Sequence, residues 1–236
     1  MAGKYTVSTY TYDGDNGRTS KTVYVRSGTT TTAVITHYIG DLFETSGGVS
    51  TDYLFLGNAR VASYDGSKFR WFIGDHLGST SLVLDQNAVM TGKIEYTPWG
   101  EVKNYEKYGT GPEVAHFYFT GKKLDDETGL IFFGARYYNP RIGRFLTPDT
   151  IVQSPYNPQT LNRYSYCNNN PINLVDPTGH SWGKVLKSAV STFVQVAVTV
   201  VLTPFIGPIA AGAVGGFLGG ALNAGLNGAS FSQAMI

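Results

Sequence analysis

The stretch 119–180 of this sequence holds an arginine and aspartates, residue types that could do hydrolytic chemistry. Arg136, Asp149 and Asp176 all fall in the stretch 119–180, which is rich in Tyr, Asn, Pro and Gly. Two carboxylates held about 3 Å apart cannot both ionise easily, so one keeps its proton while the other can activate water. An arginine beside them stabilises the ionised carboxylate or a developing oxyanion. The structural alternative is that Arg136 pairs with an aspartate and that Asp176 caps the Asp-Pro-Thr-Gly turn that it begins.

The other reactive residue types show no catalytic or metal-binding pattern. Cys167 is the single cysteine, which excludes an internal disulfide and a cysteine-rich zinc site, and we expect it to be a small buried residue. The histidines are scattered without metal-ligand spacing, at His37, His76, His116 and His180. The sequence therefore predicts neither a metal nor any other cofactor.

The composition is that of a strand-rich protein with little charge. Charged residues make up 15%, below the roughly 25% usual for globular domains, and the net charge is +1. That balance predicts no nucleic-acid partner. The first 20 residues lack the pattern of a signal peptide and read like the middle of a strand array, so we expect repeats upstream of this chain.

Short alternating runs with turns between them fill the first part of the chain. Gly, Asn and Asp separate runs rich in Val, Thr and Tyr, at a spacing of about ten residues. This pattern predicts a mainly β fold with one antiparallel, meandering sheet, and ordinary hairpins in a β-sandwich are the alternative. The predicted strands lie within 5–12, 21–27, 32–44, 50–57, 59–66, 68–74, 77–85 and 91–105.

A sharp change in charge marks the end of this pattern. Residues 188–236 contain no Asp, Glu, Lys, Arg or His. We therefore divide the chain into a repeat-like β-sheet (1–118), a core segment of irregular structure (119–180) and an uncharged, Gly/Ala-rich helical tail (181–236). In the tail, Gly212, Gly216 and Gly220 form a GxxxGxxxG pattern that predicts close helix packing. Membrane contact through 188–236 is one hypothesis for this tail, and a linker packed inside the protein until its release is the other.

Six short segments, in the same order, resemble elements of the Rhs/YD-repeat family. They are YDG at 12–14, YIGDLFE at 38–44, DHLGST at 75–80, YTPWGE at 96–101, FTGKKLDDETGL at 119–130 and GARYY at 134–138. Each would be a weak signal alone, but six in order are specific. Residues 5–180 are thus identified as similar to the C-terminal part of an Rhs repeat array followed by the Rhs repeat-associated core.

This resemblance implies both a fold and a role. The fold would be a β-sheet ribbon that forms part of a hollow shell, with the core segment plugging one end. The role would be that of a polymorphic-toxin shell, secreted or at the cell surface, which encloses and delivers a variable C-terminal segment. Its partners would be upstream repeats or a secretion protein, together with an immunity protein. A cell-surface structural or carbohydrate-contacting protein is a further alternative.

The resemblance also implies a reaction, because some family members cut themselves at the end of the core with two aspartates and an arginine. Carried onto this sequence, the catalytic residues are Arg136, Asp149 and Asp176, and the cleaved bond joins His180 to Ser181. Three positions depart from the family pattern: His180 replaces a leucine, Asn139 replaces an aspartate, and no proline follows Asp149. Aspartyl-type self-cleavage and a purely structural role both remain open at this point.

Overall fold

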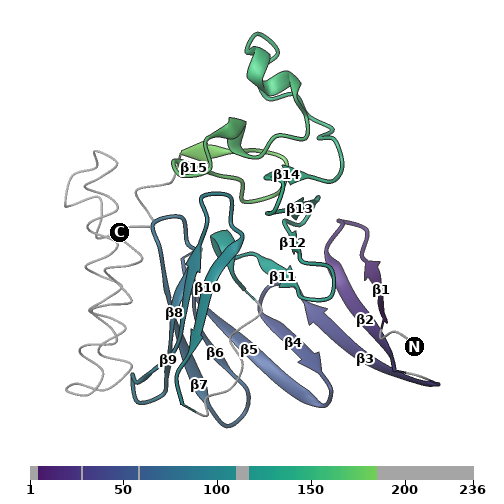
Figure 1. Cartoon of the computed structure of the whole chain (residues 1–236), viewed down its shortest axis with the longest axis vertical. Helices are drawn as coiled ribbons and strands as arrows, with labels where there is room; N and C mark the ends of the chain where they lie inside the picture. The colour runs from purple at the N-terminus through teal and green to yellow at the C-terminus, as the bar shows by residue number, and fades with distance from the viewer. Residues whose placement is uncertain (1–4, 28, 58, 110–116, 185–236) are drawn as a thin grey trace.

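The computed structural model describes residues 5–27, 29–57, 59–109 and 117–184 (Figure 1). Ten strands form one antiparallel sheet in which every strand pairs with its neighbours in the chain. The predicted meander is confirmed in the described part of the chain, where a single sheet takes all ten of these strands. The strands are β1 (Tyr5–Tyr12), β2 (Arg18–Ser27), β3 (Thr30–Ile39), β4 (Phe43–Ser46), β5 (Val49–Leu56), β6 (Ala59–Tyr64), β7 (Phe69–Gly74), β8 (Thr80–Asp85), β9 (Met90–Tyr96) and β10 (Val102–Lys107).

Two of the predicted runs are each divided by a turn. The run 32–44 becomes β3 and β4 because Gly40 adopts a φ of 55° and the chain reverses there. The run 91–105 becomes β9 and β10, since the amide of Gly100 donates to the carbonyl of Thr97 at 2.9 Å in a tight turn. A positive φ is readily available to glycine, so each reversal falls where the sequence supplies one.

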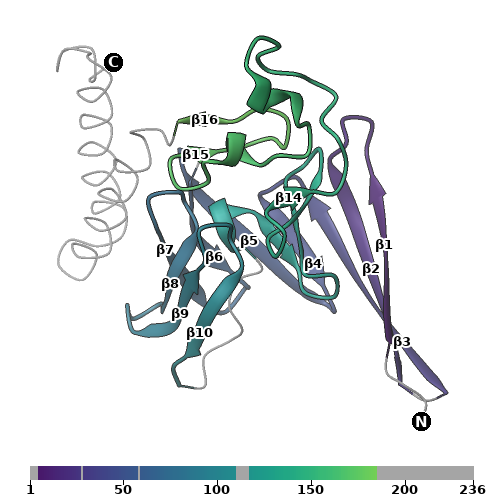
Figure 2. The same ribbon diagram turned by 45° about the horizontal axis from the view of Figure 1, so that its top comes forward.

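The large sheet curves strongly along its length. Both views show β1–β3 on one side and β7–β10 on the other, with the core segment between and above them (Figures 1 and 2). On the side of β7–β10, Phe72, Val83 and Ile94 form a small buried cluster against which Tyr118 of the core segment packs. The curved sheet agrees with the mainly β, antiparallel fold that the sequence predicted.

Residues 117–184, which we call the plug, contain more regular structure than expected. A four-stranded antiparallel meander joins β11 (Lys123–Asp125), β12 (Leu130–Phe132), β13 (Tyr137–Asn139) and β14 (Arg144–Phe145), and β15 (Leu174–Val175) pairs with β16 (Gly183–Lys184). Three short 3-10 turns complete it: η1 (Phe119–Gly121), η2 (Pro158–Leu161) and η3 (Cys167–Asn169).

An aromatic cluster forms the core of the plug. Its fully buried members are Phe119, Ile131, Phe133, Tyr138, Phe145, Tyr166 and Cys167. Cys167 is 1% exposed, as predicted for a small buried residue, and burial raises the pKa of its thiol well above the ordinary range. Burying so many rings stabilises the plug, because each fully buried large side chain contributes about 1.5–3 kcal/mol.

Buried ion pairs attach the plug to the first half of the sheet. Asp125 of β11 is fully buried and accepts from Arg18 at 2.7 Å and from Lys21 at 3.1 Å, both on β2. Next to it, Lys123 pairs with Glu44 of β4. Removing one member of such a pair would leave a buried charge unpaired, so these contacts make the docking position specific.

Backbone contacts attach the plug to the second half of the sheet. The amide of Thr80 on β8 donates to the carbonyl of Tyr118 at 3.1 Å, and the amide of Thr120 donates to the Ser79 hydroxyl at 3.1 Å. The Phe119 ring lies against Gly100, where a Cβ would overlap the ring. The plug therefore joins both halves of the curved sheet.

The tail falls outside this description. Its predicted helices and the packing role of Gly212, Gly216 and Gly220 lie in residues 185–236, beyond the described part of the chain. Within the described ranges there is no α-helix, and no helix is long and apolar enough to cross a membrane.

Candidate active site

The guanidinium of Arg136 lies between the two predicted aspartates. Its Nη2 is 2.7 Å from Oδ2 of Asp149 and 3.4 Å from Oδ2 of Asp176. All three residues are buried, with 5%, 6% and 2% of their surface exposed. The structure thus brings together the three residues that the sequence placed in one reaction. Their positions also agree with the structural alternative, in which the arginine pairs with aspartate.

Further contacts fix the orientation of Arg136. Its Nη1 donates to the carbonyl of Arg163 at 3.0 Å, and its Nε donates to the carbonyl of Gly179. The ring of Phe145 lies 3.7 Å from the guanidinium carbon. Because most of its donors are used, this side chain is held rigidly against both carboxylates.

Two turns in contact bring Arg136 and Asp176 together. Arg136 closes the turn between β12 and β13, where the Phe133 amide donates to its carbonyl at 3.0 Å. The turn that follows Asp176 packs against this one. At Gly179, where φ is 81°, a Cβ would lie 3.2 Å from the carbonyl oxygen and the Cβ of Phe133. Glycine is therefore required there for both its φ and its lack of a side chain.

Asp149 is positioned by Arg163 and by the residue before the predicted cut. Its amide donates to the carbonyl of Arg163 at 2.9 Å, and Nη1 of Arg163 donates to the Asp149 carbonyl at 3.1 Å. Its Oδ1 accepts from the Ile151 amide at 3.0 Å and lies 3.0 Å from Nδ1 of His180. His180, which departs from the family pattern, is thus in direct contact with a candidate catalytic carboxylate.

Asp176 caps its own turn and also reaches the predicted bond. Its Oδ1 accepts from the amides of Thr178 at 3.2 Å, Gly179 at 2.7 Å and Ser181 at 3.2 Å. Burial raises the pKa of Asp176 above its ordinary value, although the backbone hydrogen bonds and Arg136 oppose that shift. Asp176 therefore acts as the predicted cap and places a carboxyl group of elevated pKa on the nitrogen that a cut would release.

Both polar atoms of the His180–Ser181 peptide bond are engaged by side chains. The Ser181 amide donates to Asp176, and the His180 carbonyl accepts from Nε2 of Gln153 at 2.9 Å. The bond lies in the loop between β15 and β16, whose pairing joins Val175 to Gly183 (Figure 2). A carboxyl on the amide nitrogen, a second carboxylate beside an arginine and a donor on the carbonyl are groups that assist amide hydrolysis.

Two residues of this site escaped prediction from the sequence. Gln153 and Arg163 both lie in the stretch between Asp149 and Asp176, which has no hydrophobic periodicity. Its path is set by local caps, such as the Asn157 side chain that accepts from the Gln159 amide at 3.1 Å. The residue type alone does not indicate that the Gln153 side chain donates to the His180 carbonyl.

The remaining histidines make no metal site in the described part of the chain. No group of three or more His, Cys, Asp or Glu residues there could hold a metal ion. His76 contacts the carbonyl of Ile172 at 2.9 Å, and His37 is exposed. His116 lies outside the described residues.

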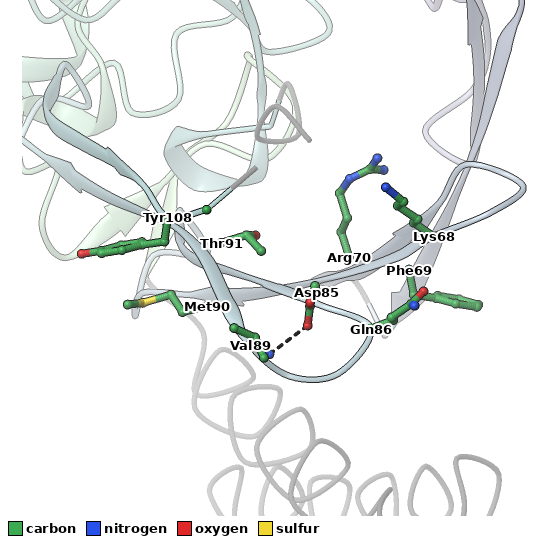
Figure 3. A pocket seen from close by; sticks show the side chains of 10 residues that line it. Lys68, Phe69, Arg70, Asp85, Gln86, Val89, Met90, Thr91 and Tyr108 are labelled. Carbon is green, nitrogen blue, oxygen red and sulfur yellow. Dashed lines mark hydrogen bonds between the residues drawn. The ribbon is translucent and has the colours of Figure 1, made fainter. Parts of the chain in front are cut away.

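A separate pocket lies at the end of the sheet remote from the plug. It has a volume of about 400 Å³ and is lined by residues of β7, the β8–β9 turn and the end of β10, including Lys68, Asp85 and Tyr108 (Figure 3). Phe69 lines it as well and belongs to a row of stacked rings, 4.6 Å from Tyr64 and 6.0 Å from Trp71 between centroids. These rings are half-buried, so they form a compact stack on the sheet.

Comparisons with known proteins place most of the described chain in one group. Residues 4–172 match the family model described as Teneurin YD-shell. The tRNA3(Ser)-specific nuclease WapA of Bacillus spizizenii is 34% identical over 185 residues, which are 73% of this chain and 7% of that protein. Toxin subunit YenC1 of Yersinia entomophaga is 26% identical over 190 residues, 72% of this chain and 19% of that protein.

A solved structure shows the same architecture. The crystal structure of TcdB2-TccC3-TEV matches with a TM-score of 0.63 and 26% identity, over 73% of this chain and 9% of that one. The chain thus spans less than a fifth of the length of each of these relatives.

Proposed function

This chain belongs to the teneurin YD-shell family, as the Rhs/YD-repeat resemblance predicted, and we propose that it is the closing end of a polymorphic-toxin shell. In this role the curved sheet forms part of the wall, the plug closes it, and the C-terminal segment is the enclosed and delivered part. The relationship to WapA and to Tc-type toxin subunits supports a role in toxin delivery.

The observation that carries this proposal is the attachment of the plug to both halves of the sheet. Asp125 binds Arg18 and Lys21 on one side, while Tyr118 and Thr120 bind the start of β8 on the other. A segment held at both sides of a curved sheet closes that end and fixes the exit of the chain beyond it. This is the geometry that enclosure of residues 188–236 requires.

The proposed partners and location follow from the same role. The edge strand β1 would pair with a strand of upstream repeats or of a secretion partner, and an immunity protein would protect the producing cell. The protein would act after secretion or at the cell surface, with residues 188–236 contacting a membrane on delivery. No nucleic-acid partner is proposed.

Protease protection tests the enclosure. The chain joined to preceding YD repeats should form a hollow particle in electron micrographs and should shield residues 188–236 from proteinase K. Asp125→Ala should release the plug and expose the tail, whereas Asp15→Ala in an exposed turn should not. Digestion of the tail at the same rate in all three proteins would contradict the proposal.

Self-cleavage after His180 is a second proposed function, favoured by the contacts of that one peptide bond. Asp149, held by Arg136, would take a proton from water as the water oxygen adds to the His180 carbonyl carbon. Asp176 would give its proton to the Ser181 nitrogen as the carbon–nitrogen bond breaks. The products are a carboxyl group on His180 and a free amine on Ser181, so one water is consumed and no cofactor is needed.

Mass spectrometry of the full chain tests this second function. A fragment beginning at Ser181 should appear in the wild-type protein, and Asp176→Asn should slow its appearance by about a hundredfold or more. Asparagine retains an oxygen that can accept from the turn amides. The change therefore removes the proton donor of the proposed reaction and keeps the hydrogen bonds that cap the turn. Equal processing of the wild-type and Asp176→Asn chains would rule out this mechanism.

The carbohydrate-contacting alternative has one surface in its favour. Phe69 joins the stacked ring row to a pocket that also presents Asp85 and Gln86, and aromatic rings with a few polar groups are typical of small-ligand sites. Binding on a glycan array that is lost in Phe69→Ala would support it. If the wild-type protein gives no more signal on the array than Phe69→Ala does, the carbohydrate-contacting alternative is excluded.

A further inference from the structure

The side-chain amide of Gln153 occupies a special position at the His180–Ser181 bond. Its Nε2 donates to the His180 carbonyl oxygen at 2.9 Å. From the sequence, Arg136 was a candidate to stabilise the oxyanion. In the structure it donates instead to the carbonyl of Gly179, one residue earlier, and to the two carboxylates. Gln153 is therefore the group that the structure aims at the reacting oxygen.

We infer that Gln153 is a catalytic residue that stabilises the oxyanion formed on His180 during self-cleavage; this inference rests on the self-cleavage proposed above. When water adds to the carbonyl carbon, negative charge develops on the oxygen that Gln153 already contacts. A neutral amide donor strengthens its hydrogen bond as that charge grows, so it binds the transition state more tightly than the ground state.

The surroundings of Gln153 hold the donor in place before the reaction. It follows Asp149 by four residues, and the backbone of Asp149 is tied to Arg163 by two hydrogen bonds. Gln153 is half-buried, so its hydrogen bond competes less with water than one on the surface would. The same short segment thus carries the base of the proposed reaction at one end and the oxyanion donor at the other.

The alternative role for Gln153 is a tether that only holds the β15–β16 loop. The two roles differ in what the loss of the N–H group does. A tether affects the position of the loop, whereas an oxyanion donor affects the rate even when the loop stays in place. A test therefore needs a measurement of the rate and a separate measurement of the carbonyl contact.

The rate is measured on the full chain by cell-free synthesis followed by a chase. Gln153→Met keeps the length of the side chain and removes the donor, and it should slow release of the Ser181 fragment by about a hundredfold. Gln159→Met is the matched control, because Gln159 is exposed on η2 and contacts Asn169, away from the bond. This control should cleave at the wild-type rate.

The carbonyl contact is read by NMR without any cleavage. His180–Ser181 is the only His-Ser pair in the sequence, so labelling His at its carbonyl carbon and Ser at its nitrogen gives one cross-peak. In an Asp176→Asn chain, which should keep the bond intact, adding Gln153→Met should shift the His180 carbonyl resonance upfield. Adding Gln159→Met should leave it unchanged.

The outcomes separate the inference from the proposal on which it rests. Slow cleavage in Gln153→Met supports the catalytic role if the His180 carbonyl resonance shifts while the Ser181 nitrogen resonance, which reports the position of the loop, stays unchanged; a shift of both resonances would identify Gln153 as a tether. If Asp176→Asn blocks cleavage while Gln153→Met cleaves at the wild-type rate, the inference about Gln153 is wrong and self-cleavage stands. If the bond also survives in the wild type, or if Asp176→Asn cleaves normally, self-cleavage and the inference fall together.

Discussion

At the scale of single residues, Asp176 combines two tasks that usually fall to different side chains. One oxygen accepts from three amides, and the other faces Arg136. A cap alone needs no burial, yet only 2% of Asp176 is exposed, and this burial raises its pKa. A carboxyl that keeps its proton to higher pH than usual is suited to protonate a leaving amine.

This pKa shift predicts how self-cleavage depends on pH. The reaction needs Asp176 to be protonated, and its raised pKa keeps that proton in place to a higher pH than an ordinary aspartate would allow. Above the pKa of Asp176 the acid loses its proton, and the rate should fall about tenfold per pH unit. Initial rates of Ser181-fragment release between about pH 4 and pH 8 measure this profile. A rate that rises through the neutral range would contradict the assignment of Asp176 as the acid.

The sequence predicted part of this site, for identifiable reasons. Arg136, Asp149 and Asp176 stand in motifs whose order and spacing carry information, and the structure brings them together. Gln153 stands in a segment shaped by local turns, so its contact with His180 depends on the folded path. The imidazole of His180 contacts Asp149 for the same reason.

At the scale of elements, the buried contact between β2 and β11 decides where the plug docks. Asp125 has no exposed surface and lies against two cations, Arg18 and Lys21. Arg18 also lies 4.6 Å from the centre of the Phe132 ring. Arg18 is thus held by both charge and aromatic contact, which favours one docking register over others.

Substitutions in this contact should show its strength. Asp125→Ala leaves the buried Arg18 without its carboxylate, while Lys21 keeps Glu127 at 3.2 Å, and the change should lower the free energy of unfolding by about 3–5 kcal/mol. Replacing both partners, as in Arg18→Met with Asp125→Leu, should recover part of that loss, because no buried arginine is then left without its carboxylate. Urea denaturation measures both variants. Equal stability of Asp125→Ala and the wild type would show that the contact does not hold the plug.

The elements themselves were easier to predict than their docking. Alternating runs and Gly-centred turns gave most strands of the large sheet, since those signals are local. The runs 32–44 and 91–105 are each divided by a turn with a positive φ at Gly40 or Gly100, and the alternation of polar and apolar residues does not predict where such a turn falls. The pairing of Asp125 with Arg18 joins positions 107 residues apart, and no local pattern encodes such a contact.

At the scale of the whole molecule, the large sheet has two strands at its edges. Within the described residues, β1 pairs only with β2, and β10 only with β9. On β1, Val7 is 50% exposed. An unpaired strand of this kind binds other strands, which is how an upstream repeat would join it.

The free edge predicts self-association of the isolated chain. Val7→Lys together with Thr9→Lys should weaken that association about tenfold, or about 1.4 kcal/mol, because lysines on an edge strand oppose pairing. His37→Lys is the control, since His37 is also exposed but pairs with Ser20 of β2 on one side and with Thr45 of β4 on the other. Sedimentation at several protein concentrations measures the effect. Equal weakening by the control would show that β1 is not the interface.

Because the strands of the large sheet pair in chain order, they can fold in the order in which the ribosome makes them. Each strand can pair as soon as its neighbour has emerged, because β1 to β10 follow one another without a crossover. The plug must wait, since Asp125 needs β2 and Tyr118 needs β8, and it forms only after the whole wall exists. Hydrolysis at His180 would then be an irreversible signal that assembly is complete, and a nascent chain with a faulty wall would keep its C-terminal segment attached.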